Sequence, residues 1–175
     1  MAMGKSRKII HSIFDWMSTL VVALCVFALL FAFFVRIVTV DGSSMLPTFQ
    51  DGDRLMLSIM DTHYERGDVI VVDRYTDDPL IKRVIAVGGD TISIDADGRV
   101  YINGKYIYEG YIQGETVLRD FGGEVKVPQG YLFIMGDNRT TSKDSRSAEI
   151  GLVSVKDVVG KAIFCVWPMQ SFGKV

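Results

Sequence analysis

The longest apolar run in the chain lies near the N-terminus and constrains the fold more than any other feature. Residues Met17 to Val35 are apolar apart from Ser18 and Thr19. As a helix, these 19 residues would be roughly 28 Å long, close to the ~30 Å hydrocarbon core of a bilayer. The run is too long for a cleaved secretory signal, no pair of small residues follows it, and it lacks the polar face of a buried soluble helix. We therefore predict a single, uncleaved membrane anchor.

Basic residues are distributed unevenly around this run. Lys5, Arg7 and Lys8 precede it, whereas Arg36 stands alone at its end. Positive charge favours the cytoplasmic side of a membrane. We predict that residues 1–37 form a cytoplasmic N-terminus and transmembrane anchor, and that residues 38–175 form an extracytoplasmic β-rich domain. The protein would then be a single-pass protein of the cell membrane.

Short β-type runs separated by Gly and Asp follow the anchor, and helical periodicity is nearly absent. Asn103-Gly104 separates two such runs and is a strong signal for a two-residue hairpin. The predicted strands are Arg54–Ser58, Asp68–Val72, Leu80–Val87, Thr91–Ile94, Arg99–Ile102, Lys105–Tyr108, Glu124–Val127, Tyr131–Met135 and Gly160–Trp167. This pattern predicts an all-β domain of sandwich or barrel type.

Charge and ligand-forming residues disfavour several classes of function. The formal net charge of −2 supplies no basic field for nucleic acid. The two histidines and two cysteines are His11, His63, Cys25 and Cys165, and they are too scattered for a zinc site. We expect no metal, no cofactor and no nucleic-acid partner.

Ser44 lies in a turn that begins soon after the apolar run. Gly42 permits a positive φ or a close backbone approach, and Pro47 stiffens the exit from the turn. Such a segment is often a plain surface turn, and a serine is a weak nucleophile unless a base lies beside it. Ser44 is therefore a candidate nucleophile only if a base accompanies it.

Lys82 is the candidate base. In the predicted strand Leu80–Val87, alternation places Lys82 on the face of Leu80, Val84 and Ala86, which is otherwise apolar. Burial would lower the pKa of the amine and allow it to accept a proton near neutral pH. The alternative is a lysine whose stem packs while its head stays in water. Lys161, which heads an apolar strand, is the one rival at the level of sequence.

The segment Gly136 to Arg146 is rich in short polar side chains and in charges of both signs. It is either a solvated loop or a tightly hydrogen-bonded loop that positions the catalytic amine.

Taken together, these residues resemble type I signal peptidase, the membrane-bound Ser/Lys protease that removes signal peptides. The resemblance covers residues 37–167 and resides in four blocks that occur in the order and spacing typical of that family. They are Gly42-Ser43-Ser44-Met45-Leu46-Pro47-Thr48; Arg66-Gly67-Asp68-Val69-Ile70-Val71-Val72; Ile81-Lys82-Arg83-Val84; and Gly136-Asp137-Asn138-Arg139 through Ser142, Asp144, Ser145 and Arg146.

The resemblance implies that Ser44 is the nucleophile, that Lys82 is the general base and that the Ser44 backbone N–H donates to the oxyanion. Some members of the family carry a serine two residues before the nucleophile, whose hydroxyl adds a second donor. Here that position is Gly42, as in the shorter bacterial members.

Supporting roles follow from the same resemblance. Ser142 would hydrogen-bond the Lys82 amine, and Arg83, Asp144 and Arg146 would brace the site as an ionic network.

The implied substrate is the extended end of a signal peptide, bound as an added strand. Alternate side chains of a strand point the same way, which fits cleavage sites of small-x-small type. The resemblance implies that Val38, Val40, Met45 and Ile81 line the pockets. The implied partners are preproteins, the lipid bilayer and the nearby secretion translocon. Two large apolar residues, Phe49 and Trp167, are either lipid-facing or core residues.

Two other interpretations stay open. One is a Ser/Lys peptidase dedicated to a single pilin or conjugation substrate, and another is a non-catalytic, membrane-anchored module that binds exported peptides. A soluble, self-cleaving repressor-type protease is disfavoured by the anchor. A histidine-dependent serine hydrolase is also disfavoured, because His63 is the one histidine after the anchor.

Overall fold

The structure, a computed structural model, describes residues 3–73, 75–76 and 78–175. The chain divides into two compact units, Met1–Val35 and Arg36–Val175, which we describe separately. Residues 1–2 of the predicted cytoplasmic segment, and the side chains of Lys5, Arg7 and Lys8, lie outside the described parts.

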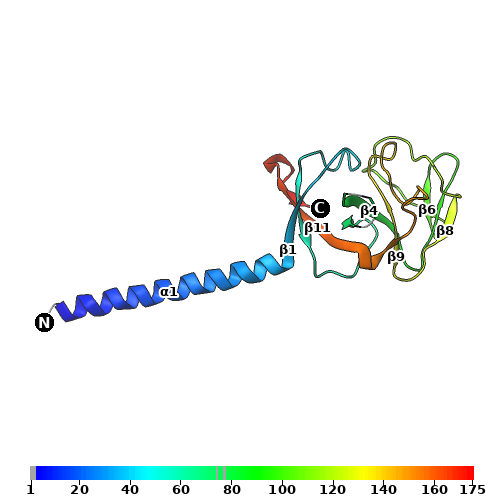
Figure 1. The fold of residues 1–175 in the computed structure, drawn as a ribbon. Coiled ribbons are helices and arrows are strands. Elements are labelled where there is room, and N and C mark those ends of the chain that lie inside the picture. Colours follow the sequence, from blue (N-terminus) through cyan, green and yellow to red (C-terminus); the bar gives the residue numbers. More distant parts are fainter. Residues whose placement is uncertain (1–2, 74, 77) are drawn as a thin grey trace. The chain divides into compact units, whose positions relative to one another are not determined.

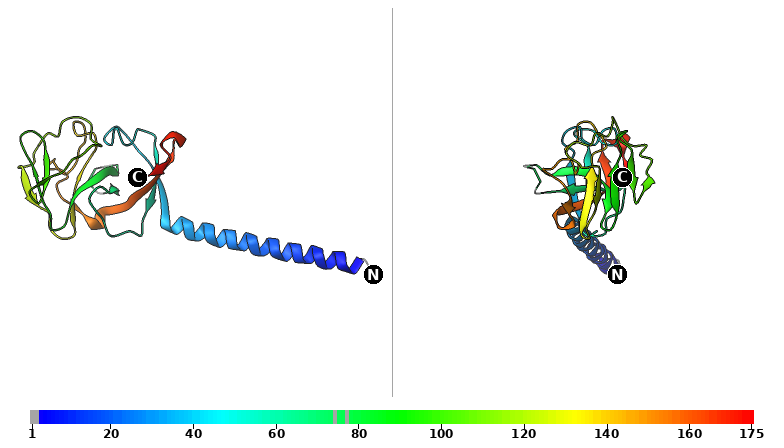
Figure 2. Two further views of the ribbon diagram at one scale, coloured as in Figure 1. Left: turned by 180° about the vertical axis from the view of Figure 1, so that it is seen from behind. Right: turned by 90° about the vertical axis from the view of Figure 1, so that its right-hand side faces the viewer.

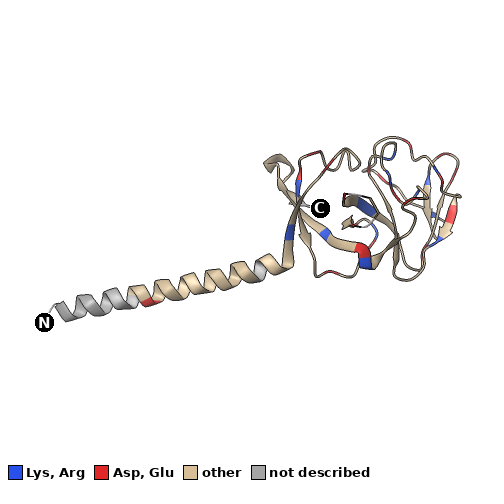
Figure 3. Ribbon diagram, viewed as in Figure 1, with Lys and Arg blue, Asp and Glu red and all other residues tan. Residues whose placement is uncertain are grey.

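The first unit is a long helix, α1 (Met3–Phe34). Its segment Ile13–Phe34 is long and apolar enough to cross a membrane, a test that a signal sequence also passes. Asp15 is the single acidic or basic residue in that segment of the sequence. In Figure 3 the described part of the helix is tan apart from one red band. The helix ends one residue before the end of the apolar run, because Val35 begins a strand.

The second unit is built on a large sheet and a small sheet (Figure 1). The large sheet has the order β1-β2-β11-β3-β4-β9-β10, with β12 paired to β11. Its strands are β1 (Val35–Thr39), β2 (Arg54–Ser58), β3 (Val69–Val72), β4 (Leu80–Val87), β9 (Tyr131–Met135), β10 (Val153–Ser154), β11 (Val158–Trp167) and β12 (Gly173–Lys174). Short 3₁₀ helices, η1 (Val155–Asp157) and η2 (Met169–Ser171), precede β11 and β12.

The small sheet has the order β7-β6-β5-β8 and is antiparallel throughout. Its strands are β5 (Thr91–Ile94), β6 (Val100–Ile102), β7 (Lys105–Tyr106) and β8 (Glu124–Lys126). Asn103 and Gly104 adopt φ values of 54° and 74°, the conformation required by the predicted hairpin turn. In Figure 1 and in the left view of Figure 2, β6 and β8 lie on one side of β4 and β9 while β11 lies on the other.

The predicted all-β class is confirmed, and each predicted strand is present to within a few residues. The prediction missed β1, β10 and β12. The last two contain two residues each, so they are too short to show an alternating pattern. β1 directly follows the helix and shares its apolar composition, so composition alone does not mark where it starts.

Three apolar clusters of described residues form the core of this unit. All four residues of β3 are buried, with Val69 and Val71 in one cluster and Ile70 and Val72 in another. The central sheet is therefore covered on both faces, which accounts for the unbroken apolar run in β3. The third cluster joins the small sheet to β4 and β9.

The structure changes one detail of the predicted packing and decides another that the sequence left open. The alternation proposed for β4 is interrupted by a bulge between Val84 and Ala86, so Ala86 joins Ile85 in the cluster under the small sheet. Of the two residues expected to be either lipid-facing or in the core, Phe49 is 4% exposed and belongs to the core, whereas Trp167 is 55% exposed.

Candidate active site

Ser44 lies in the connection between β1 and β2, in a turn held from several directions. Gly42 adopts a φ of +78°, and its N–H donates to the Asp51 carboxylate over 2.8 Å. The Ser44 carbonyl accepts a hydrogen bond of 3.0 Å from the Asn138 N–H. The Ser44 N–H donates to none of the described residues, so it is available to a ligand.

Lys82 reaches Ser44 from β4. Its Nζ lies 2.9 Å from Ser44 Oγ and also donates to the Ile81 carbonyl over 2.9 Å. The residue is 2% exposed, which excludes the alternative in which the amine lies in bulk water. Burial lowers the pKa of Lys82 to about 8, against the opposing effect of the Asp144 and Asp137 carboxylates. A neutral amine is therefore accessible at mildly alkaline pH.

Asp144 and Arg146 form a fully buried ion pair 2.8 Å long. Asp144 also accepts a hydrogen bond from the Gly136 N–H. Burial raises the pKa of Asp144, but its bonds to Arg146 outweigh that effect and hold the pKa below its usual value. Asp144 is thus a fixed negative charge behind Lys82.

Ser142 is buried next to this pair. Its hydroxyl contributes to lowering the pKa of the Asp144 carboxyl, yet it makes no hydrogen bond of regular geometry to any described residue. The bond from Ser142 to the Lys82 amine is not formed in this structure. Its orienting role stays a prediction.

Arg83 does not join Asp144 and Arg146. Its guanidinium instead makes two bonds to the Asp137 carboxylate, of 2.9 and 2.6 Å, and one of 2.8 Å to the Gly67 carbonyl. Thr48 also donates to Asp137. Arg83, Asp144 and Arg146 therefore belong to two separate ion pairs, where the resemblance implied one network.

The segment 136–138 wraps around the backbone of the Ser44 turn. Asn138 donates from its side chain to the Ser43 carbonyl and from its backbone to the Ser44 carbonyl. Gly136 packs so closely that a Cβ there would overlap the Ser44 carbonyl and Ser142 Oγ. The roles of Gly136, Asp137 and Asn138 were missed, although all three lie in the fourth sequence block.

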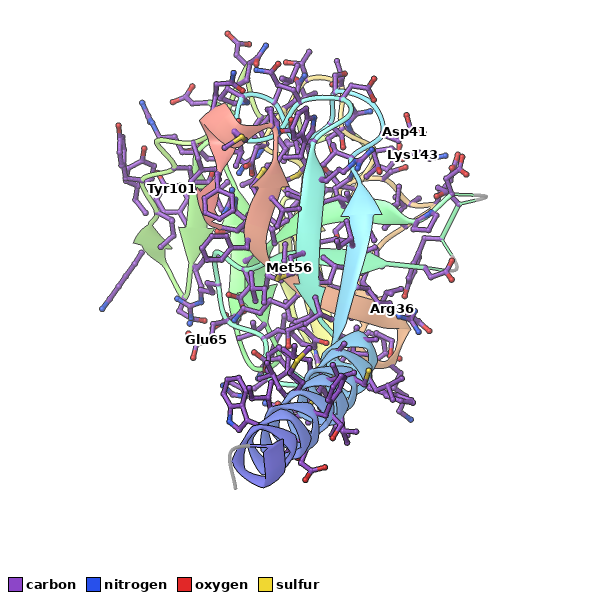
Figure 4. All side chains as sticks on the ribbon, turned by 90° about the vertical axis from the view of Figure 1, so that its left-hand side faces the viewer. Arg36, Asp41, Met56, Glu65, Tyr101 and Lys143 are labelled. Atoms are coloured by element: carbon purple, nitrogen blue, oxygen red, sulfur yellow. The ribbon has the colours of Figure 1, made fainter. Side chains whose placement is uncertain are left out.

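A groove of about 560 Å³ opens in front of Ser44 and Lys82. Its other described lining residues are Val38, Thr39, Asp41, Gly42, Ser43, Val71, Asp78, Pro79, Leu80, Ile81, Thr141 and Lys143. Figure 4 labels Asp41 and Lys143 among the side chains of this unit.

Of the four residues expected to contact substrate, Val38 and Ile81 line the groove. Val40 and Met45 are 3% and 0% exposed and pack with Ile81 in the core. Their predicted contact with substrate stays a prediction, and in this structure they support the groove from within.

Two unpaired strand edges flank the groove. β1 is the first strand in the sheet order. Within the described residues, the start of β4 pairs only with β3, because its pairing with β9 begins at Arg83. An extended peptide can therefore add main-chain hydrogen bonds on either side.

Among the described side chains, no cluster of three or more His, Cys, Asp or Glu residues is suited to hold a metal ion.

The chain is similar to known proteins of one family. Residues 13–167 match the family model described as "Signal peptidase, peptidase S26". The chain is 35% identical to "Signal peptidase I" of Bacillus licheniformis, covering 97% of both chains. It is 34% identical to "Signal peptidase I S" of Bacillus subtilis (strain 168), covering 93% of this chain and 94% of the relative. A solved signal peptidase I from Enterococcus faecalis V583 is 27% identical, with a TM-score of 0.47 and coverage of 56% of this chain and 95% of that chain. The chain therefore belongs to the signal peptidase I family of serine endopeptidases, peptidase family S26.

Proposed function

We propose that this protein removes N-terminal signal peptides from exported preproteins with a Ser44–Lys82 dyad. The observation that carries the proposal is the 2.9 Å contact between Lys82 Nζ and Ser44 Oγ, made by an amine that is almost wholly buried. A serine becomes an effective nucleophile when a base is held within hydrogen-bonding distance. Membership of the signal peptidase family supports the same assignment.

The reaction begins when neutral Lys82 accepts the Ser44 proton as Ser44 Oγ attacks the scissile carbonyl carbon. The Ser44 N–H donates to the oxyanion that forms. The Lys82 ammonium then protonates the leaving amine, the C–N bond breaks, and an acyl group remains on Ser44. Lys82 next removes a proton from water as the water oxygen attacks the acyl carbon. The bond from that carbon to Ser44 Oγ then breaks, Lys82 returns the proton to Ser44 Oγ, and the signal peptide leaves with a free carboxylate.

The substrate would lie in the groove as an extended strand between Val38–Thr39 and Leu80–Lys82. Because alternate side chains of a strand share one direction, two of them would point at the wall formed by Val38 and Ile81. That wall rests on buried Val40 and Met45, which leaves little depth for large side chains. The arrangement supports cleavage after small-x-small sequences.

The membrane would supply the remaining restriction on substrate. We infer that α1 anchors the protein as a single span, with residues 1–37 as cytoplasmic N-terminus and anchor and residues 38–175 as the extracytoplasmic peptidase domain. The anchor would hold the groove near the boundary at which an exported signal peptide leaves the bilayer, close to the translocon. The length and apolar composition of Ile13–Phe34 support this location.

Cleavage of a purified preprotein in detergent or vesicles tests the proposal. The wild type should release a mature protein whose new N-terminus follows a small-x-small sequence. Ser44→Ala and Lys82→Ala should each abolish cleavage while the thermal unfolding transition is kept. Full activity in either variant would rule out the dyad. A folded wild type that binds exported peptides but neither cleaves them nor reacts with a serine-directed inhibitor would favour a non-catalytic module.

A further inference from the structure

We propose that Glu109 is a positioning residue for the Ser44–Lys82 pair, acting from outside the four sequence blocks. This inference rests on the proposed function. Glu109 follows β7 in a long irregular loop and is 8% exposed. Its carboxylate is the point at which two chains of contacts meet, and both lead to the turn 136–138 that holds Ser44.

The first chain of contacts runs through Arg139. The Arg139 guanidinium makes two bonds to Glu109, of 2.8 and 2.5 Å, and its side chain is 0% exposed. It also donates to the Gly136 carbonyl over 3.1 Å and to Thr116 Oγ1 over 3.0 Å. A buried guanidinium requires a carboxylate partner. Glu109 therefore allows Arg139 to stay buried while it donates to the Gly136 carbonyl.

The second chain of contacts runs through Tyr111. Its hydroxyl donates to Glu109 over 2.8 Å. Burial, followed by the charge of Glu109, raises the pKa of Tyr111, so the hydroxyl stays protonated and remains a donor. The Arg83 guanidinium lies over the Tyr111 ring at 4.3 Å from its centroid, a cation–π contact. Arg83 in turn forms an ion pair with Asp137.

The two chains of contacts form a closed circuit because Gly136 and Asp137 are neighbours in sequence. Gly136 packs against the Ser44 carbonyl. The Asn138 N–H donates a hydrogen bond to the same carbonyl. Arg83 follows Lys82 directly in β4. One carboxylate therefore restrains both partners of the dyad, through the turn on one side and through the strand on the other.

The backbone of the loop strengthens this link. The Gln113 N–H donates to the Asp137 carbonyl over 2.8 Å, and the Gln113 carbonyl accepts from the Arg139 N–H over 2.9 Å. A shift of the loop around Glu109 would therefore be transmitted to the turn 136–138. Misplacement of catalytic groups by about 1 Å can cost ~10²-fold in rate.

Two matched substitutions test this role. Glu109→Gln keeps the shape but removes the charge that holds Arg139, and Tyr111→Phe keeps the ring under Arg83 but removes the bond to Glu109. Glu115→Gln and Tyr108→Phe are the matched controls, because both residues are exposed and lie in the same loop. Cleavage is measured per active site, titrated with a serine-directed inhibitor, so that loss of folded protein does not count.

We expect kcat to fall ~10- to 100-fold in Glu109→Gln and less in Tyr111→Phe, with KM changed less than about threefold and both controls unaffected. The double variant should be no slower than Glu109→Gln alone, because the Tyr111 hydroxyl acts through the same carboxylate. Glu109→Asp, which keeps the charge, should recover part of the rate.

The pH dependence of kcat/KM separates positioning from mere scaffolding. The carboxylates that act on the pKa of Lys82 are Asp144, which is paired with Arg146, and Asp137, which is paired with Arg83. The charged residues Asp41, Asp78 and Lys143 line the same groove as the amine. When Arg83 loses its support, Asp137 is less well neutralised and favours the ammonium form more strongly. The rise of kcat/KM should then shift to higher pH in Tyr111→Phe, which changes no charge. Glu109→Gln also removes a negative charge, which favours the neutral amine and opposes that shift.

The proposal is overturned if Glu109→Gln and Tyr111→Phe retain the wild-type kcat and pH profile per titrated site. It is equally overturned if the only change is a lower melting temperature. Should Glu109→Gln fail to fold, Tyr111→Phe still decides, because it leaves the Glu109–Arg139 pair intact. If the wild type cleaves and Ser44→Ala is inactive, the proposed peptidase function holds, and a negative result then counts against the role of Glu109 alone.

Discussion

Lys82 combines a reactive group with a cost to stability. The strand around it is apolar, so burial lowers the pKa of the amine from 10.5 to about 8. Below that pH the folded protein holds a buried ammonium whose compensation comes from Ser44, the Ile81 carbonyl and two carboxylates further away. The same burial that makes the residue a base therefore opposes folding at neutral pH.

Replacement of Lys82 by Met should inactivate the protein and change how its stability depends on pH. Between pH 8 and 10.5 the unfolded chain binds more protons at this residue than the folded chain, so wild-type stability rises with pH through that window. Lys82→Met lacks this titration. Between pH 7 and pH 9.5, the free energy of unfolding of the wild type should therefore rise by about 2 kcal/mol relative to that of the variant, at ~1.4 kcal/mol per pKa unit. Denaturant unfolding of both proteins at the two pH values measures the difference, and a gap that does not change with pH would contradict the prediction.

At the scale of elements, the decisive piece is the turn 136–138 that follows β9. Its backbone contributes to the site as its side chains do, because the Asn138 N–H donates to the Ser44 carbonyl and the Gly136 carbonyl accepts from Arg139. The Asn138 side chain donates to the Ser43 carbonyl. The strands β4 and β9 that deliver Lys82 and this turn are paired from Arg83 to Val87. Two neighbouring strands thus set the distance between the base and the loop that holds the nucleophile.

Substitution of Gly136 by Ala should disable this arrangement. The added methyl group would overlap the Ser44 carbonyl and Ser142, and a backbone oxygen cannot rotate away. We expect a loss of about 1–3 kcal/mol in the free energy of unfolding and a fall in kcat of ~10²-fold. Gly122→Ala is the control, since a Cβ there meets nothing within 4 Å and the residue needs no positive φ. Equal behaviour of the two variants in unfolding and cleavage assays would count against the role of the turn.

At the scale of the whole molecule, the three apolar clusters of described residues are formed by residues that follow α1. The two sheets and these clusters are thus built from residues that follow the helix in sequence. The helix, in turn, exposes its apolar side chains along Ile13–Leu29. The β unit should therefore be able to fold alone, whereas the full chain should require a bilayer or detergent.

A chain lacking residues 1–34 tests this independence. It should be soluble without detergent, unfold in one cooperative transition, and cleave a soluble peptide that carries a small-x-small site, while no longer floating with vesicles. Circular dichroism, peptide cleavage and vesicle flotation measure these properties against the full chain in detergent. Aggregation of the shortened chain, or a broad transition, would show that its core depends on the helix.

Local pattern in the sequence was enough to predict the helix and most strands, and to select Ser44 and Lys82 as candidate nucleophile and base. These features depend on composition and periodicity within short windows, and on motifs whose residues lie close together in the chain. Asn103-Gly104 is an example, because two neighbouring residues suffice to specify a hairpin turn.

The tertiary structure alone decided which charges meet. Arg83 binds Asp137 rather than Asp144, Glu109 reaches Arg139 across 30 positions of sequence, and Phe49 is covered by strands that lie far from it in the chain. Such contacts depend on strand order and register, and a single bulge in β4 is enough to change which face Ala86 presents. Sequence patterns report what each segment prefers by itself, whereas burial and ion pairing depend on which distant segments the fold brings against it.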